Sequence, residues 1–379
     1  MNFLSEEQQL WMATVERWID NEIGPEYIRK CDVDRQFPFE AYQKLADLGW
    51  LKLIIPEEIG GDGGDIFSYA LMCEALAKYG VDFCIAMTAS TFNVVSIVKY
   101  GSPEQKKQYV LPFMRGEIRI PVSISEPNAG SDAANTQTRG ERVGDDYIIN
   151  GQKIWCSGAS NKGAVILMLV KTEKTEDKRK GLSVFIIPNT TPGLDIRPLP
   201  TLPRRSVVTT EIFLDNVRIP ASQMLGLPGQ GWEIIGGELE LERIAIAAGY
   251  VGNAQAVVSE ALKYAHERKQ FGKAIYDFQV ISHMLADMQT QTDAARLLTY
   301  RAAELASQRI PCRKEVAMAK LFSSETLQTV SRQGMQILGG YGTLPDFDME
   351  RHFREGMQAT IGGGTSQMQR NIIARALRL

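Results

Sequence analysis

The spacing of hydrophobic residues changes twice along this chain of 379 residues. Up to about residue 115, apolar residues recur every three or four positions, which is typical of helices packed against a core. From about 116 to 225, short β-rich or apolar runs alternate with turn signals, which is typical of strands. Beyond that point the helical spacing returns in longer segments. The pattern predicts an α+β fold in which a β-domain lies between two helical regions of the sequence.

The predicted domains follow these changes of spacing. Residues 1–115 are expected to form an N-terminal helical domain, 116–225 a middle β-barrel or sandwich, and 226–379 a C-terminal four-helix bundle. The helices expected in the first domain are 5–23, 38–48, 66–79, 84–100 and 103–115. The strands expected in the second are 118–124, 147–150, 165–170, 182–187 and 210–219. The helices expected in the third are 229–268, 278–307, 313–338 and 363–377.

Charge and composition argue against several classes of site and partner. The net charge of -3 gives no support for a nucleic-acid partner. The 3 histidines and 5 cysteines show no metal-ligand spacing, so no metal is expected, and the cysteines are expected to be reduced thiols. No run of about eighteen apolar residues is present, so no membrane span is expected. The start M-N-F-L-S-E-E lacks a signal sequence and predicts a cytoplasmic protein, with Ser5 capping the first helix.

Four separated motifs combine glycines with polar side chains. S-I-S-E-P-N-A-G-S-D (123–132) ends a strand in a turn that exposes N–H groups and hydroxyls, and I-N-G-Q-K-I-W-C-S-G (149–158) contains an Asn-Gly hairpin signal. The other two are E-R-K-Q-F-G-K-A-I-Y-D-F-Q (267–279) and Q-I-L-G-G-Y-G (336–342). Taken singly, each motif has an ordinary structural explanation: a polar surface turn, a strand with a core tryptophan, or a helix end closed by glycine.

Taken together, and with the C-terminal I-G-G-G-T-S-Q-M-Q-R (361–370), these motifs resemble the signatures of the acyl-CoA dehydrogenase family over essentially the full chain. The resemblance implies an FAD-dependent enzyme that acts on an acyl-CoA. It also implies a homotetramer, built as a dimer of dimers, with FAD held between the β-domain and the C-terminal helices. An electron-transfer flavoprotein is the implied electron acceptor.

The resemblance assigns four residues of the β-domain to the flavin. Ser125 matches a residue that bonds the pyrimidine ring, and Ser131 matches one associated with the pyrophosphate and the substrate. Trp155 is implied to place its flat face beside the isoalloxazine ring. Ser157 matches a hydroxyl residue that donates toward flavin N5, the atom that receives hydride.

The helical region supplies the remaining cofactor residues that the resemblance implies. Arg268 is expected to meet the pyrophosphate of the neighbouring subunit's FAD, because its planar fork matches phosphate oxygens. Gln270 and Phe271 are expected near the adenosine of that same FAD. The other matched positions are Gln336, Gly339 and Gly340 toward the neighbour's FAD, and Thr365 and Gln367 toward the FAD of the same chain.

The position of the catalytic base departs from the commonest form of the family signature. That form is Y-E-G-T-S-x-I-Q, whose Glu is the base, and this chain has Gly363 in its place. The segment L-E-L-E-R-I (239–244) offers Glu242 instead, and isovaleryl-CoA and long-chain members of the family carry their base in a similar motif. An isolated Glu next to Arg243 is more often a solvated helix residue. The loss at 363 and the gain at 242 together favour Glu242 as the base.

The surroundings of the reacting carbons are also implied by the resemblance. Glu240 and Arg243 match positions near the CoA portion of the substrate, and the backbone N–H of Gly363 is expected to hold the thioester carbonyl together with a flavin ribityl hydroxyl. Glu238 lies four residues before Glu242, so the two carboxylates are expected to share a helix face. If both are partly buried, their repulsion raises the pKa of one of them.

The sequence therefore predicts the α,β-dehydrogenation of a short or branched acyl-CoA. The α-proton goes to Glu242 and the β-hydride goes to flavin N5. Two alternatives keep the same site: a dehydrogenase acting on acyl groups carried by a carrier protein, and an enoyl-CoA reductase. A third alternative is a flavin-binding protein of the same fold that has lost catalysis, and a fourth is a flavin monooxygenase.

Overall fold

The computed structural model describes residues 4–378, except for the side chain of Glu238. Contacts between residues divide the chain into two compact units. The first unit contains the chain up to Lys30, the segment Asp65–Ile85 and everything from Arg243 onward, and the second contains Cys31–Gly64 and Ala86–Glu242. The boundaries of the three predicted domains stay a prediction.

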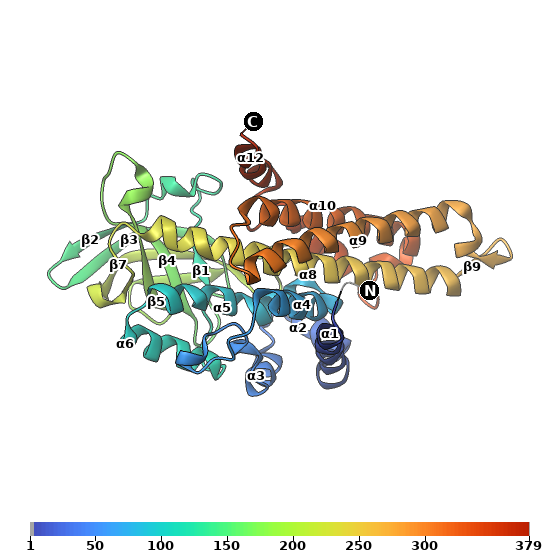
Figure 1. Cartoon of the computed structure of the whole chain (residues 1–379), viewed down its shortest axis with the longest axis horizontal. Helices are drawn as coiled ribbons and strands as arrows, with labels where there is room; N and C mark the ends of the chain where they lie inside the picture. Colours follow the sequence, from blue (N-terminus) through green and yellow to red (C-terminus); the bar gives the residue numbers. More distant parts are fainter. Residues whose placement is uncertain (1–3, 379) are drawn as a thin grey trace. The chain divides into compact units, whose positions relative to one another are not determined.

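The second unit is built on an eight-stranded sheet in the order β6-β7-β3-β2-β4-β5-β8, with β1 paired to β4 off this path (Figure 1). Its strands are β1 (Val122–Ser123), β2 (Arg139–Val143), β3 (Asp146–Ser157), β4 (Val165–Lys171), β5 (Leu182–Pro188), β6 (Leu194–Pro198), β7 (Thr209–Pro220) and β8 (Met224–Leu225). Pairing is antiparallel except for β1 with β4 and β2 with β4. The core side chains of this sheet include Ile149, Ile166, Phe185 and Ile212.

The chain forms helices before and after the strands of this sheet. They are α1 (Glu6–Trp18), α2 (Pro25–Val33), α3 (Phe39–Asp47), α4 (Ile66–Leu76), α5 (Val81–Tyr100), α6 (Pro103–Gln105), α7 (Leu111–Met114), α8 (Gly231–Glu267), α9 (Gln279–Ser307), α10 (Arg313–Leu338), α11 (Met349–Ala359) and α12 (Ser366–Ala376). A short hairpin of β9 (Lys269–Gln270) and β10 (Lys273–Ala274) joins α8 to α9. The predicted α+β fold class is confirmed.

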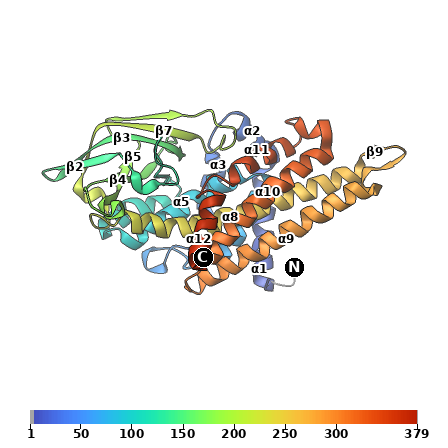
Figure 2. The ribbon, with the colours of Figure 1, turned by 90° about the horizontal axis from the view of Figure 1, so that it is seen from above.

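The long C-terminal helices run alongside one another in the first unit (Figure 2). Helix α10 packs against α9, α11 and α12, and the Gln255 and Gln289 side chains join α8 to α9 through paired amide hydrogen bonds of 3.1 Å. Ser5 caps α1 as expected, and it forms a reciprocal capping box with Gln8. Helices α2 and α11 were not predicted, and the strand expected at 118–124 shortens to β1.

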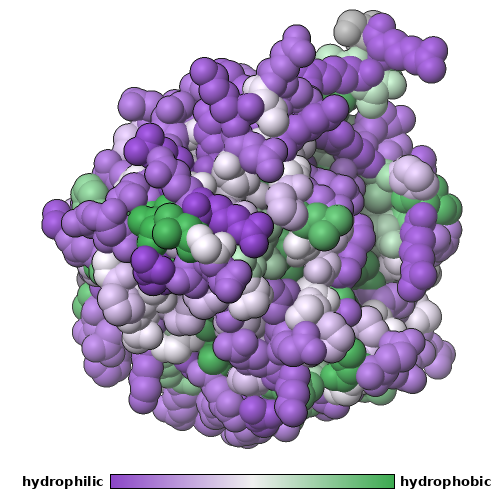
Figure 3. Space-filling model, turned by 90° about the vertical axis from the view of Figure 1, so that its left-hand side faces the viewer, coloured by the Kyte–Doolittle hydropathy of each residue, from purple (hydrophilic) through white to green (hydrophobic). Residues whose placement is uncertain are grey.

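One helix reaches the length and hydropathy of a membrane span. Helix α5 has a mean hydropathy of 1.6 over its most apolar window, although polar residues such as Asn93 interrupt its apolar runs. Since 83% of that window is buried within the protein, α5 has the character of a core helix. On the face of the molecule drawn in Figure 3, hydrophobic residues form small separate groups among hydrophilic ones. All five cysteines are buried and none of them forms a disulfide, as expected for reduced thiols.

Helix α11 buries charged and polar side chains in the first unit. The ring of His352 is buried, and the amide of Asn253 donates to its Nδ1 atom over 2.7 Å. Burial, helped by the nearby charge of Arg351, lowers the pKa of His352 to about 4. Asp348 accepts from Arg29 at 2.7 Å and lies 3.0 Å from Arg351, so this region is held together by ion pairs.

His352 is expected to make the protein less stable as the pH falls from about 6.5 to about 4. In that window the unfolded chain binds a proton that folded His352 excludes, which costs up to about 3 kcal/mol of unfolding free energy. Chemical denaturation at several pH values should show that the unfolding free energy falls less in acid for His352→Gln than for the wild type. Burial also raises the pKa of nearby Glu260 to about 7, which acts in the opposite direction, so the difference between the two proteins is the quantity to measure.

Exposed His283 provides the matched control. The variant His283→Gln should keep the acid dependence of the wild type. Equal acid dependence in His352→Gln and the wild type would contradict the prediction.

Candidate active site

The end of strand β3 presents an exposed tryptophan in a strained backbone conformation. Trp155 has a φ of 65°, lies at an irregularity in the pairing of β3 with β7, and exposes 59% of its surface. Positive φ is uncommon for a bulky residue, and a β-bulge re-aims side chains. The neighbouring Cys156 is buried in the sheet core, whereas Ser157 is half-buried. The irregularity thus leaves the indole exposed directly beside the buried Cys156.

A buried ion pair joins the first two motifs in the second unit. The Glu126 carboxylate accepts hydrogen bonds from the backbone N–H groups of Gln137 (2.7 Å) and Thr138 (2.9 Å) and from Lys153 Nζ (3.0 Å). Lys153 Nζ also donates to the carbonyl of Ile124 at 3.0 Å. Glu126 lies in S-I-S-E-P-N-A-G-S-D and Lys153 in I-N-G-Q-K-I-W-C-S-G. This contact therefore fixes the turn of the first motif to the strand that carries Trp155.

The pKa shifts of this pair follow from its burial. Burial lowers the pKa of Lys153 to about 8, against the opposing attraction of Glu126. For Glu126, burial works to raise the pKa, but the charge of Lys153 and the hydrogen bonds from Gln137 and Thr138 outweigh it and hold the pKa below its usual range. The pair was not predicted from the sequence. A Lys at an inward position of a strand that also contains Trp155 is the signal that could have revealed it.

The two predicted serines of the first motif, Ser125 and Ser131, come before and after Glu126 in the sequence. The carbonyl of Ser125 accepts from the N–H of Ile154 on β3 over 3.0 Å. Ser125 therefore lies beside the part of β3 that comes directly before Trp155. Ser131 is exposed, next to the short 3-10 turn Ala133–Asn135. Its exposed hydroxyl is available to a phosphate or another hydrogen-bonding group of a ligand.

Helix α8 carries the predicted base next to a residue that contacts the glycine loop. Glu240 and Glu242 are both half-buried, and the side chain of Glu238 lies outside the described residues. Arg243 is buried, and its Nε donates to the carbonyl of Gly363 over 3.0 Å. The helix that bears Glu242 is thus tied, one residue further on, to the position where the family signature has its Glu. The substrate role of Arg243 stays a prediction.

The glycine loop 361–365 is held by two further buried side chains. Lys320 Nζ donates to the carbonyls of Ala359 (3.0 Å) and Gly364 (2.9 Å), and Gln369 Nε2 donates to those of Gly363 (3.1 Å) and Gly364 (2.9 Å). The bonds from Arg243 and Gln369 to Gly363 both engage its carbonyl.

The backbone of this loop favours glycine. Gly363 and Gly364 have φ values of 64° and 87°, in the left-handed region. Thr365 caps α12, whereas Gln367 is exposed. Lys320 was missed by sequence reasoning. The sequence feature that could have revealed it is its spacing, because Lys320 belongs to a series of positions, three or four residues apart, that form the buried face of α10. This series includes Val316, Ser324 and Leu327.

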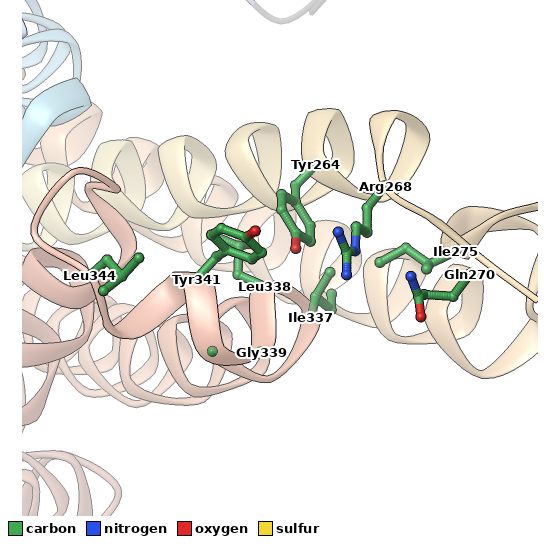
Figure 4. A pocket seen from close by; sticks show the side chains of 10 residues that line it. Tyr264, Arg268, Gln270, Ile275, Ile337, Leu338, Gly339, Tyr341 and Leu344 are labelled. Atoms are coloured by element: carbon green, nitrogen blue, oxygen red, sulfur yellow. The ribbon is translucent and has the colours of Figure 1, made fainter.

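A pocket in the first unit brings together four of the predicted cofactor residues. It has a volume of about 490 Å³ and is drawn in Figure 4. Its lining residues are Tyr264, Arg268, Gln270, Ile275, Ile337, Leu338, Gly339, Gly340, Tyr341 and Leu344. The guanidinium of Arg268 lies 5.7 Å from the ring centre of Tyr341, so a cation and an aromatic face share the pocket. A Cβ added at Gly339 or Gly340 would meet no atom within 4 Å, so both backbones face open space.

The hairpin beside this pocket places a strained aromatic residue at its tip. Phe271 and Gly272 have φ values of 51° and 81°, which matches a type I′ turn between the paired residues Gln270 and Lys273. Phe271 exposes 93% of its surface and is not among the residues that line the pocket. Gln336 is likewise exposed and outside the lining. An exposed aromatic held in a strained turn is typical of a residue that contacts another molecule.

These features fit a dinucleotide flavin. An outward-facing indole with a hydroxyl two residues away suits a tricyclic ring with a polar edge, and an arginine beside bare glycine backbone suits a pyrophosphate. Each unit thus holds its own group of suitable residues. Of the predicted residues, the structure gathers Arg268, Gln270, Gly339 and Gly340 in one pocket, whereas Gln336 and Phe271 are exposed and lie outside its lining.

Three family models match successive parts of the chain. They describe the N-terminal, middle and C-terminal domains of acyl-CoA dehydrogenases, and they match residues 5–117, 122–217 and 229–378.

Individual proteins show the same similarity over full length. The chain is 40% identical to the probable acyl-CoA dehydrogenase YngJ of Bacillus subtilis, with 100% of each chain covered. It is 35% identical to the human mitochondrial short-chain specific acyl-CoA dehydrogenase, over 98% of this chain and 90% of the relative. Among solved structures, butyryl-CoA dehydrogenase from Megasphaera elsdenii superposes with a TM-score of 0.94 and 31% identity, covering 100% of both chains.

Proposed function

Because this chain belongs to the acyl-CoA dehydrogenase family of FAD-dependent oxidoreductases, we propose that it oxidises a short or branched acyl-CoA with Glu242 as its base. One observation supports this choice most directly. Arg243, the residue after Glu242, donates to the carbonyl of Gly363, which occupies the place of the usual Glu. The left-handed backbone at Gly363 would disfavour a Glu there by about 1–2 kcal/mol.

Each protein group has a defined task in the proposed reaction. The Glu242 carboxylate takes the α-proton of the thioester, and the N–H of Gly363 donates to the thioester carbonyl as negative charge develops on it. Trp155 would hold one side of the flavin ring, and Ser157 would donate a hydrogen bond to its polar edge. FAD, when bound, supplies the acceptor for the β-hydride. The chain's charged side chains at Lys320 and Arg243 hold the Gly363 loop in place for this task.

The substrate class is supported by the relatives, whose names include a short-chain specific enzyme. An anaerobic screen of straight-chain, branched and cyclic acyl-CoAs tests it, with loss of flavin absorbance as the signal. The proposal expects rapid bleaching by short or branched substrates. Bleaching only by carrier-bound thioesters, or turnover only in the reductive direction with enoyl-CoA, would favour the corresponding alternative. An unchanged spectrum across the whole panel would favour a non-catalytic flavin protein.

The electron acceptor and assembly are part of the same proposal. We propose an electron-transfer flavoprotein as the acceptor, and a homotetramer in which Arg268 reaches the pyrophosphate of a neighbour's FAD. The position of Arg268 in an open pocket of about 490 Å³, next to the exposed tip of Phe271, supports this arrangement.

Replacing Arg268 is expected to weaken FAD binding. Arg268→Met removes a charged hydrogen-bond donor to phosphate, so the dissociation constant of FAD should rise by about 10- to 100-fold. Titration of apoprotein with FAD, followed by flavin fluorescence, measures the change. Lys269→Met, one residue further along the hairpin and exposed, is the matched control and should bind FAD normally. Equal weakening in both variants would mean that general charge, rather than Arg268, is responsible.

A further inference from the structure

The hydroxyl groups of Ser157 and Thr209 face each other across strands β3 and β7. The two residues are direct partners in the antiparallel register, and their oxygen atoms lie 3.3 Å apart. Thr209 is only 4% exposed, whereas Ser157 is half-buried. The pair therefore has one enclosed member and one member that opens toward the site.

The hydrogen-bonding capacity of the pair determines which hydroxyl donates. Two hydroxyls carry two protons, and their mutual hydrogen bond uses one of them. Among the side chains that the structure describes, Ser157 provides the one hydrogen-bond partner of Thr209 Oγ1. A buried donor left unpaired is costly, so the proton of Thr209 is directed to Ser157. The Ser157 proton is then available to an acceptor outside the pair.

The backbone around Thr209 keeps this geometry rigid. Val208 and Arg204 have φ values of 63° and 62°, and the N–H of Val208 donates to the carbonyl of Arg204 over 2.9 Å. The carbonyl of Val208 in turn accepts from the N–H of Gly158, next to Ser157, over 2.9 Å. A β-branched residue with positive φ is a genuine outlier that the surrounding structure must impose. These contacts hold Thr209 at a fixed place relative to Ser157.

We propose that Thr209 is a positioning residue, which fixes the hydroxyl of Ser157 as a hydrogen-bond donor toward the acceptor edge of the flavin ring. The inference rests on the place given to Ser157 in the proposed function. Thr209 acts only through Ser157, because its own hydroxyl is enclosed between the two strands. A serine is more mobile at χ1 than a β-branched residue, so a fixed partner matters more for Ser157 than it would for a threonine.

The test compares Thr209→Val, Thr209→Ser and Thr210→Val in the FAD-loaded protein. Thr209→Val keeps the shape and removes the hydroxyl, and it should weaken FAD binding about three- to tenfold, the range for one hydrogen bond. It should also shift the visible absorption band of oxidised FAD. Thr209→Ser should restore both. Thr210 donates instead to the carbonyl of Cys156 at 2.8 Å, so Thr210→Val loses a buried hydrogen bond without these flavin effects.

The Ser157→Ala background separates this inference from the proposed function. Ser157→Ala alone should weaken FAD binding and shift the spectrum, and adding Thr209→Val should then have no further effect on either. If Ser157→Ala has its effect and Thr209→Val matches the wild type, the positioning role is wrong and the role of Ser157 stands. If Ser157→Ala itself matches the wild type, the role of Ser157 fails, and the Thr209 inference fails with it. Additive effects of the two changes would also overturn the coupling.

Discussion

Glu242→Gln is expected to slow flavin reduction by a good acyl-CoA substrate by about 10²- to 10⁴-fold, the usual contribution of a general base. Gln keeps the size and most of the polarity of Glu but cannot accept the α-proton. Gln and Glu have similar helix propensities, so helix α8 should persist in the variant. Stopped-flow measurement of flavin bleaching under anaerobic conditions gives the rate, and FAD content with circular dichroism reports the fold.

Glu233→Gln is a matched control on the same helix. Glu233 lies in the first turn of α8 and accepts from the hydroxyl of Tyr100 at 3.1 Å, in an exposed position. It should leave the rate of bleaching unchanged. Near-normal bleaching in Glu242→Gln would end the assignment of the base, and a loss of FAD in that variant would show that Glu242 acts through the fold instead.

Glu126→Gln is expected to destabilise the second unit by about 3–5 kcal/mol, the cost of leaving one partner of a buried ion pair alone. Lys153 is 0% exposed and would keep an uncompensated charge among the strands unless it loses its proton. Its pKa, already about 8, should then fall further. Urea unfolding of the apoprotein measures the stability, and FAD affinity should fall as well because Trp155 lies two residues after Lys153.

The pair between Arg139 and Glu141 on the same sheet is the control. Its nitrogen and oxygen lie 3.3 Å apart, but both side chains are about two-thirds exposed, so Glu141→Gln should cost less than about 1 kcal/mol. The double variant Glu126→Gln with Lys153→Met should recover part of the lost stability, since no buried charge remains. Equal stability of Glu126→Gln and Glu141→Gln would show that the buried pair contributes little.

Helices α2 and α11 could not be predicted from the sequence, for two different physical reasons. Helix α2 begins at Pro25, directly after Gly24. A Gly-Pro pair is a common turn signal, but Pro is also common at the first position of a helix, so the pair does not distinguish the two. Helix α11 buries Arg351, His352, Arg354 and Glu355, so most of the side chains on its buried face are polar or charged. A hydrophobic pattern cannot detect such a face, because the burial of those groups depends on partners elsewhere in the chain.

Some features of the candidate site could be predicted from the sequence, and others could not. The glycines and hydroxyls of its motifs could be identified from local sequence, because backbone turns and polar turn residues obey local rules. Strand β3, however, was expected only at 147–150 and continues to Ser157 through the irregularity at Trp155. The outward aim of that indole follows from a bulge, and its φ of 65° has no sequence signal.

The order of helices and strands, the four motifs and the replacement of the usual Glu by Gly363 are properties of the sequence alone, since each is set by residues close together in the chain. Only the tertiary structure decided which polar groups meet: Arg243 reaches a carbonyl 120 positions away, and Lys153 pairs with a carboxylate 27 positions away. A buried charge is stable only beside a partner at hydrogen-bond distance, and that distance is determined by folding rather than by position in the sequence.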